Sequence, residues 1–240
     1  MSRKFNAMLG LGALAAFGFA SSAFAQCPSS PVPPWTTQSA LGGALAIVAG
    51  GYDSTSCRLD SSITTNIGGA SAFVRDNTPE DEASYRAQFL VNADNLTGLN
   101  AIQSAKIFGA TTEAAFGGVG DLVYIGVQGN FSGTATLGIR TVCEGQTGNV
   151  CSATAPLAAG VNRVEIAYAK GGNPSLRVWV NNTTEATPTL ELNGNNNSWG
   201  GVDFATLGLA TPSPGFRTGQ ANRTVGFDEF DSRRTTFIGN

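Results

Sequence analysis

The chain has no histidine among its 240 residues, and charged side chains make up only 13% of it. Without histidine, Ser-His-Asp triads, Cys-His pairs and histidine-ligated zinc sites are excluded, so any catalysis would depend on carboxylates or tyrosine. The charge content is about half of that in ordinary soluble proteins. The 14 basic residues are scattered and are outnumbered by 17 acidic ones. Such a surface repels nucleic acid and anionic membranes, so we expect neither as a partner.

Long apolar runs are absent after residue 25. Residues 1–25 carry Arg3 and Lys4, then an apolar run over 7–20, and end on Ala-Phe-Ala at 23–25. This order predicts a secretory signal peptide cleaved after residue 25, with a retained membrane anchor as the alternative. Removing these 25 residues from 240 leaves 215, with 12 basic and 17 acidic side chains. We therefore expect a secreted, periplasmic or cell-surface protein that does not insert into a membrane.

The four cysteines are the only cross-linking chemistry in the chain. An even number of cysteines in an oxidising compartment predicts two disulfides, for which three pairings exist in principle. Cys143 and Cys151 flank a turn-rich loop that would bring two strand ends together, and a bond between Cys27 and Cys57 would then tie down the N-terminal arm. Redox or metal-binding cysteines are the alternative, but the chain has no Cys-x-x-Cys spacing.

Helical periodicity is also missing after residue 25, and strand periodicity replaces it. Leu176, Val178 and Val180 alternate with Arg177 and Trp179, as in a half-buried β-strand. The same pattern recurs at 44–48, 56–60, 72–75, 85–91, 105–109, 122–128, 134–142, 164–170, 176–180, 204–208 and 225–232. Short strands that each have one apolar face favour two sheets packed face to face. We expect an all-β fold, an antiparallel two-sheet β-sandwich or jelly roll.

Three segments resemble laminin-G-like members of the concanavalin A-like lectin/glucanase superfamily. They are the strand at 85–91 with the acidic segment 76–82 before it, Leu-Arg-Val-Trp-Val-Asn-Asn at 176–182, and Gly-Phe-Asp-Glu-Phe-Asp-Ser-Arg-Arg at 226–234. The resemblance implies a concanavalin A-like jelly roll over about residues 41–240. It says less about function, because the superfamily includes lectins, hydrolases, lyases and adhesive modules. The Pro- and Ser-rich residues 26–40 would form an extended N-terminal arm before this domain.

Two carboxylates near the C-terminus are the sharpest catalytic candidates. Glu229 and Asp231 are two residues apart, so a regular strand would project both from one face, as the acid and nucleophile of a retaining glycosidase require. Laminarinase-type glucanases of the superfamily that this chain resembles carry a third acid further along, where this chain has Arg233 and Arg234. An ordinary terminal strand explains the same residues, and we favour that interpretation.

Calcium is the cofactor that the resemblance implies, because laminin-G-like and lectin domains often hold this ion on a loop at the rim of the sandwich. The densest group of oxygen donors is formed by Asp76, Asn77, Glu80, Asp81 and Glu82. Calcium prefers such carboxylate and amide oxygens. No Asp-x-Asp-x-Asp-Gly loop is present, and a solvated acidic turn would produce the same sequence. We favour the solvated turn and expect no cofactor, with calcium as the alternative.

The candidate sugar-binding loop lies over residues 193–200. Trp199 could stack on the apolar face of a pyranose, while Asn195, Asn196 and Asn197 supply amide donors and acceptors for its hydroxyls. Trp179, on the polar face of its strand, could extend this surface. In the alternative interpretation Trp199 caps the edge of the core and the asparagines form turns.

These features together predict a secreted non-catalytic module that binds carbohydrate or another extracellular ligand. Its partner would be an extracellular glycan or a surface protein. The alternatives are a divergent glycoside hydrolase that uses Glu229 and Asp231, and a structural envelope or matrix protein.

Overall fold

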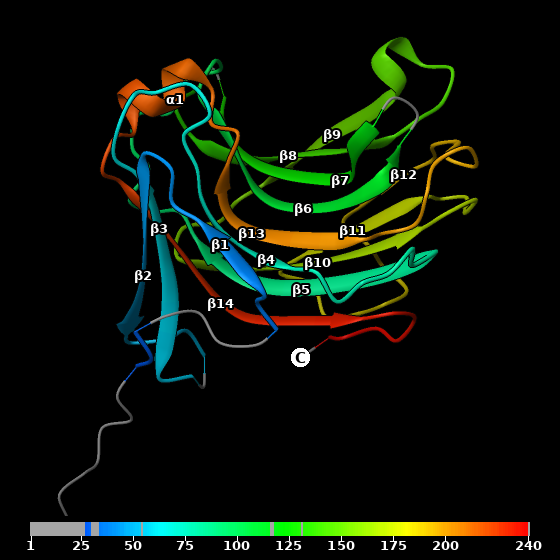
Figure 1. Cartoon of the computed structure of the whole chain (residues 1–240), viewed down its shortest axis with the longest axis horizontal. Helices are drawn as coiled ribbons and strands as arrows, with labels where there is room; N and C mark the ends of the chain where they lie inside the picture. Colours follow the sequence, from blue (N-terminus) through cyan, green and yellow to red (C-terminus); the bar gives the residue numbers. More distant parts are fainter. Residues whose placement is uncertain (1–26, 30–33, 54, 116–117, 131, 240) are drawn as a thin grey trace, which may run out of the picture.

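Two antiparallel seven-stranded sheets pack face to face (Figure 1). The structure is a computed structural model that describes residues 27–29, 34–53, 55–115, 118–130 and 132–239. The predicted signal peptide, residues 1–25, lies outside the described residues. The predicted all-β antiparallel sandwich is confirmed.

The chain order of the elements shows how the two sheets are built. Sheet A has the order β1-β4-β13-β6-β7-β8-β9, and sheet B has the order β12-β11-β10-β5-β14-β3-β2. The elements are β1 (Thr37–Ser39), β2 (Gly43–Ala49), β3 (Cys57–Ile63), β4 (Ala72–Asp76), β5 (Ser84–Asn92), β6 (Ser104–Ala115), β7 (Gly118–Gly129), β8 (Ala135–Val142), η1 (Thr147–Asn149), β9 (Val150–Pro156), β10 (Val161–Ala169), β11 (Leu176–Val180), β12 (Leu190–Leu192), β13 (Phe204–Ala210), α1 (Pro214–Gly219) and β14 (Thr224–Arg233).

The core lies between the sheets and is made by the alternate apolar residues that define the strands. Phe89 of β5 and Phe108 of β6 stack across it with their ring centroids 5.4 Å apart. Phe227 of β14 and Leu207 of β13 are buried in the same cluster. Because one side of each strand is used in this way, the other side of sheet A is free to carry polar groups.

Three short or polar strands and one short helix are absent from the sequence-based prediction. β1, β9 and β12 all lie at sheet edges, where one partner is missing and the apolar alternation is weak. Helix α1 begins after Ser213, whose hydroxyl accepts a hydrogen bond from the Phe216 amide, and Pro214 occupies its first turn. Only Phe216 of this helix is fully buried, so it shows no helical periodicity.

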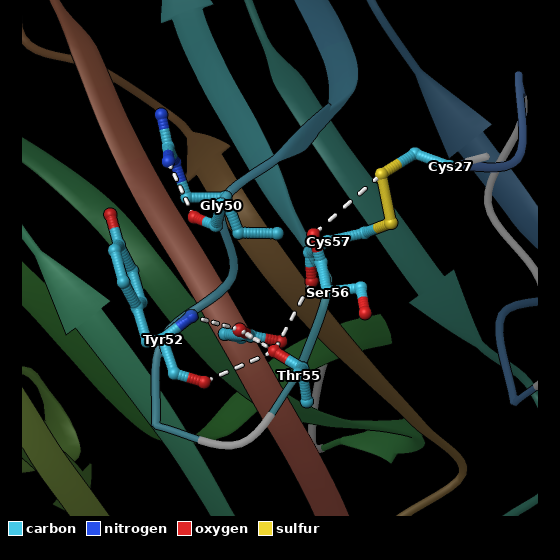
Figure 2. The surroundings of a disulfide bond; sticks show 8 residues. Cys27, Gly50, Tyr52, Thr55, Ser56 and Cys57 are labelled. Atoms are coloured by element: carbon cyan, nitrogen blue, oxygen red, sulfur yellow. Dashed lines mark hydrogen bonds between the residues drawn. A yellow bond between two sulfur atoms is a disulfide. The ribbon is translucent and has the colours of Figure 1, made fainter. Parts of the chain in front are cut away.

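Both predicted disulfides are confirmed. Cys27 bonds to Cys57 and fixes the N-terminal segment to β3 (Figure 2). Cys143 bonds to Cys151 and joins the end of β8 to the start of β9. Disulfides of this kind are typical of proteins outside the cytoplasm. Among the described residues, no helix is long and apolar enough to cross a membrane.

Candidate functional site

The outer face of sheet A is concave, because its strands curve upward at both ends (Figure 1). Strand pairing aligns one residue from each of the seven strands in a row across this face. The row is Thr37, Arg75, Thr206, Gly109, Tyr124, Arg140 and Ser152. Neighbouring strands are about 4.8 Å apart, so the row is long enough for several units of an extended polymer.

A groove of about 480 Å³ lies on the half of this face formed by β1, β4, β13 and the adjoining ends of β6 and β7. Its floor combines cationic, acidic, hydroxyl and aromatic side chains. Those that the following argument uses are Arg75, Lys106, Thr111, Asp121, Phe204 and Thr206.

Two polar atoms converge above Gly109 in this groove. A Cβ atom on Gly109 would lie 3.2 Å from the hydroxyl of Thr206 and 3.3 Å from the Nζ atom of Lys106. A side chain at Gly109 would therefore crowd both groups. The Lys106 ammonium lies 2.9 Å and 3.0 Å from the two carboxylate oxygens of Asp121. The Thr206 hydroxyl, by contrast, is buried and has no hydrogen-bond partner among the residues that the structure describes.

Arginines extend the positive charge on either side of this point. The guanidinium of Arg75 lies over the Phe204 ring, 3.4 Å from its centroid. Arg75 also lies 3.7 Å from Glu113, which is well exposed. Further along the row, the exposed Arg140 lies over the Tyr124 ring at 4.8 Å. Both guanidinium groups retain N–H donors that can reach a ligand on the concave face.

Tyr124 is a neutral hydrogen-bond donor in this row. Burial raises the pKa of its phenol because it disfavours the phenolate, and the nearby Asp121 carboxylate adds to this increase. Arg140 acts in the opposite direction without cancelling the shift. Gly126 makes room for the ring, since a Cβ atom there would lie 2.6 Å from the Tyr124 oxygen. The phenol therefore stays protonated at neutral pH.

The predicted asparagine loop lies elsewhere, at one end of the sandwich, and its members have different environments. Asn196 is fully buried and holds the loop together through hydrogen bonds to Gly171 and Tyr168. Asn195 and Asn197 are exposed and bond to each other, with 2.9 Å between the Asn197 Nδ2 and Asn195 Oδ1 atoms. The loop thus presents two of its three predicted amides to solvent.

The two tryptophans proposed as sugar platforms are both packed against protein. Trp179 is 1% exposed, and its ring lies 5.3 Å from that of Phe237. Its indole N–H donates to the carbonyl oxygen of Thr184. A buried indole offers no face to a sugar, so the structure gives Trp179 a packing role. Trp199 is half-buried against the edge of the core.

A β-bulge separates the two predicted catalytic carboxylates. The register between β14 and β5 shifts between Asp228 and Asp231, and Glu229 has a positive φ of 48°. Asp231 consequently pairs with Gln88 and forms an ion pair with Arg233 on the outer side of sheet B. Glu229 instead lines a cavity beside Trp35 and Phe227. The simple alternation that predicted both carboxylates on one face was wrong at this bulge.

The five predicted calcium ligands do not converge. Asp76 is buried and accepts a hydrogen bond from the Thr78 amide, whereas Asn77 bonds to Arg75 on the concave face. Asp81 accepts from the Gly201 amide, Glu82 pairs with Arg234, and Glu80 is exposed. Among the described residues, no group of three acidic, cysteine or histidine side chains is placed to hold a metal ion.

Sequence reasoning missed the residues that meet in the concave row. Lys106, Tyr124 and Arg140 each lie at polar positions of predicted strands, and Gly109 and Gly126 lie on the same face. The sequence did contain one signal, because charged residues and glycines on the same side of neighbouring strands indicate a face with room for a ligand. The register that aligns them depends on pairing between distant strands, which one sequence does not reveal.

Solved structures with a similar fold include polysaccharide lyases. No protein-family model matches the sequence, and a comparison with curated proteins found no match. An endo-β-1,4-glucuronan lyase from the fungus Trichoderma reesei superposes with a TM-score of 0.66 at 18% identity, covering 90% of this chain and 97% of the lyase. An alginate lyase from Pseudomonas aeruginosa gives 0.53 at 13% identity, covering 74% and 83%.

A further alginate lyase, Aly36B, gives a TM-score of 0.56 at 11% identity and covers 80% of this chain and 88% of its own. These similarities show a shared jelly-roll fold. They do not confirm the laminin-G-like assignment.

Proposed function

We propose that the protein binds an acidic polysaccharide along the concave row of sheet A. The observation that carries this proposal is the buried Thr206 hydroxyl, which lies above Gly109 beside the Lys106 ammonium and has no hydrogen-bond partner in the described part of the chain. A buried hydroxyl without a hydrogen bond is costly, and a ligand oxygen would remove that cost.

The chemistry of the row supports an acidic sugar. A sugar carboxylate can accept hydrogen bonds from Lys106 and Thr206. Arg75 of β4 pairs with Thr206 of β13 and so lies beside it. Sugar hydroxyls can donate to Asp121, whose other contacts already include Thr111. Glucuronan and alginate, after which the neighbouring lyases are named, are both acidic polysaccharides. With the predicted signal peptide, this favours an extracellular or cell-surface glycan as the partner.

The proposal is tested by calorimetry on residues 26–240 with alginate, polyglucuronate and neutral cello-oligosaccharides. We expect at least one acidic polymer to bind, with an affinity that falls as salt is added because exposed charges are screened. Arg140→Gln should weaken binding about tenfold, which corresponds to about 1.4 kcal/mol. Arg177→Gln is the matched control, because Arg177 pairs with Glu191 on sheet B. Equal effects of the two variants, or binding of the neutral oligosaccharides alone, would contradict the proposal.

Eliminative cleavage is a second candidate, favoured by the neutral phenol of Tyr124 within the row. In such a step the Asp121 carboxylate in the groove would take the C–H proton beside the sugar carboxylate. A carbon–carbon double bond would form, the glycosidic C–O bond would break, and the leaving oxygen would take a proton. Tyr124 can supply the last proton because its phenol is protonated at neutral pH, and its raised pKa keeps it so.

The products of the bound polymer distinguish the two candidates. Elimination creates a double bond that absorbs ultraviolet light, whereas binding alone leaves the polymer intact. Hydrolysis by Glu229 and Asp231, the alternative considered from the sequence, would create new reducing ends without that double bond. If elimination occurs, Tyr124→Phe should abolish it and leave binding largely intact. Binding without either product supports the non-catalytic module.

A further inference from the structure

A second cavity, of about 380 Å³, lies where the turn after β10 meets the loop at 193–197. All of its lining residues are glycine or asparagine, and we call it the amide pocket. They are Gly171, Gly172, Asn173, Asn193, Gly194, Asn195 and Asn197. None of these residues belongs to the concave row, so the amide pocket is independent of the function proposed above.

A buried side chain fixes the two walls of the amide pocket relative to each other. Asn196 is 0% exposed, and its side-chain oxygen accepts a hydrogen bond of 2.7 Å from the Gly171 amide. Its side-chain nitrogen donates to the Tyr168 hydroxyl at 3.0 Å and to the Ala169 carbonyl oxygen at 3.3 Å. One asparagine thus ties the loop to the β10–β11 turn, which limits the ordering cost of binding.

The other side of the loop is anchored to the end of β8. A Cβ atom on Gly194 would collide with the Val142 carbonyl oxygen and the Cys143 sulfur, so only glycine fits there. The Glu144 amide donates to the Asn195 carbonyl oxygen at 2.7 Å, and the Glu144 carboxylate accepts from the Ser198 amide and hydroxyl. The pocket is therefore pre-formed.

The lining offers unused hydrogen-bonding groups and no charge. Among the residues that the structure describes, the side chains of Asn173 and Asn193 have no hydrogen-bond partner, and both are exposed. Each amide carries two N–H donors and one carbonyl acceptor. The nearby Glu144 carboxylate is held by Ser198. A ligand that fits must itself present adjacent donors and acceptors without a net charge.

We propose that the amide pocket binds a neutral sugar residue through its neighbouring hydroxyl groups. Each sugar hydroxyl both donates and accepts, which matches paired amides at Asn173 and Asn193. A uronate is disfavoured because its carboxylate would lose solvation without meeting a cation. No aromatic residue in the described part of the chain lines the cavity, so the affinity for a single sugar is weak.

The proposal is tested by NMR on isotopically labelled residues 26–240, following the side-chain NH₂ signals of Asn173 and Asn193. Glucose, galactose, mannose, glucuronate and calcium chloride are titrated separately. We expect saturable shifts with at least one of the three neutral hexoses and none with glucuronate. Asn193→Ala should weaken the hexose response at least fivefold.

The matched control is Asn95→Ala, because Asn95 is exposed and its side chain makes no hydrogen bond within the described part of the chain. It should leave the hexose response unchanged, as should Arg140→Gln in the concave row. The absence of shifts with all three hexoses, shifts with calcium only, or a response that Asn193→Ala does not weaken would each overturn the proposal. The titration of the unmodified chain decides the case if Asn193→Ala does not fold.

Discussion

The outer faces of the two sheets carry similar pairs of an arginine and an aromatic residue, but the pairs differ in exposure to solvent. On sheet A, Arg140 lies over the ring of Tyr124 at 4.8 Å and remains exposed. On sheet B, Arg86 lies over the ring of Trp179 at 5.5 Å, and both are buried. The difference arises because the last residues of the chain cover sheet B, whereas nothing in the described structure covers the row on sheet A. A polar strand face becomes a site only where no other segment uses its groups.

The cover on sheet B is a short segment at 234–239 that returns along β14 (Figure 1). The amides of Ile238 and Gly239 each donate to the carboxylate of Glu165 at 3.0 Å. Glu165 is 2% exposed and lies 3.4 Å from the Arg86 guanidinium. Its hydrogen-bonding capacity is thus used within the chain, in contrast to that of Thr206 on sheet A.

Breaking the cover should produce the largest effect on the comparison. Glu165→Ala removes the acceptor for both tail amides and one of the two carboxylates that pair with Arg86, and Glu185 remains as the other. We expect a loss of about 2–4 kcal/mol in the free energy of unfolding. Urea denaturation measures this loss. Asp231→Asn is the control, since the exposed pair of Asp231 and Arg233 should contribute below about 1 kcal/mol. Similar losses in the two variants would show that the tail does not depend on Glu165.

The tyrosines give the next largest effect, at alkaline pH. Burial raises the pKa of Tyr168 and of Tyr124 above the ordinary value of 10.0. Below pH 10 both are protonated in the folded and unfolded chains, so their contribution to stability is constant. Above it the unfolded chain ionises first, and stability falls as pH rises through the folded pKa. The slope is about 1.4 kcal/mol per pH unit for each such tyrosine.

Phenylalanine variants of Tyr168 and Tyr124 compare the alkaline loss of stability caused by a tyrosine in the core with that caused by a tyrosine in the concave row. Tyr168 is 2% exposed, whereas Tyr124 is only half-buried. Tyr168→Phe should therefore reduce the alkaline slope over a wider pH range than Tyr124→Phe does. Unfolding curves measured from pH 8 to about pH 12 test which of the two variants reduces the slope over the wider pH range. The opposite order would mean that the groove protects its tyrosine better than the core does.

The sequence predicted most of the strands, but it did not predict which strand faces are exposed and which are covered. Alternation along β5 and β11 predicted both strands, because their apolar residues fill the core. It could not show that Phe237 would cover Trp179, since that contact joins distant segments. The bulge near Glu229 also escaped, because a residue added to one strand is visible only against its partner.

The candidate site was hidden for a related reason. Arg75, Thr206 and Arg140 come from strands that are far apart in the sequence and become a row only through pairing register. By contrast, the loop asparagines are contiguous, so Asn195 and Asn197 could be predicted as a group even though their surroundings could not. Local clusters are therefore readable from one sequence, whereas cross-strand sites are not.

The smallest expected effect comes from comparing two threonine hydroxyls. We propose that the Thr206 hydroxyl binds a ligand, whereas the Thr141 hydroxyl forms a hydrogen bond within the protein. Thr206 is 7% exposed, and its hydroxyl has no hydrogen-bond partner within the described residues. Thr141 is 2% exposed, and its hydroxyl donates to the Leu122 carbonyl oxygen at 2.8 Å. Thr206→Val should lower affinity for the acidic polymer about three- to tenfold while leaving the free energy of unfolding unchanged or raised.

Thr141→Val should show the reverse pattern, with about 1 kcal/mol less stability and unchanged affinity, because it removes a hydrogen bond within the protein. Calorimetry and urea denaturation on the two variants measure both quantities for the same chemical change. If Thr206→Val instead lost stability without losing affinity, its hydroxyl would belong to the fold, as that of Thr141 does. Thr206 would then no longer support the contrast between the two outer faces, in which the polar groups of sheet A remain available to a ligand and those of sheet B are used within the chain.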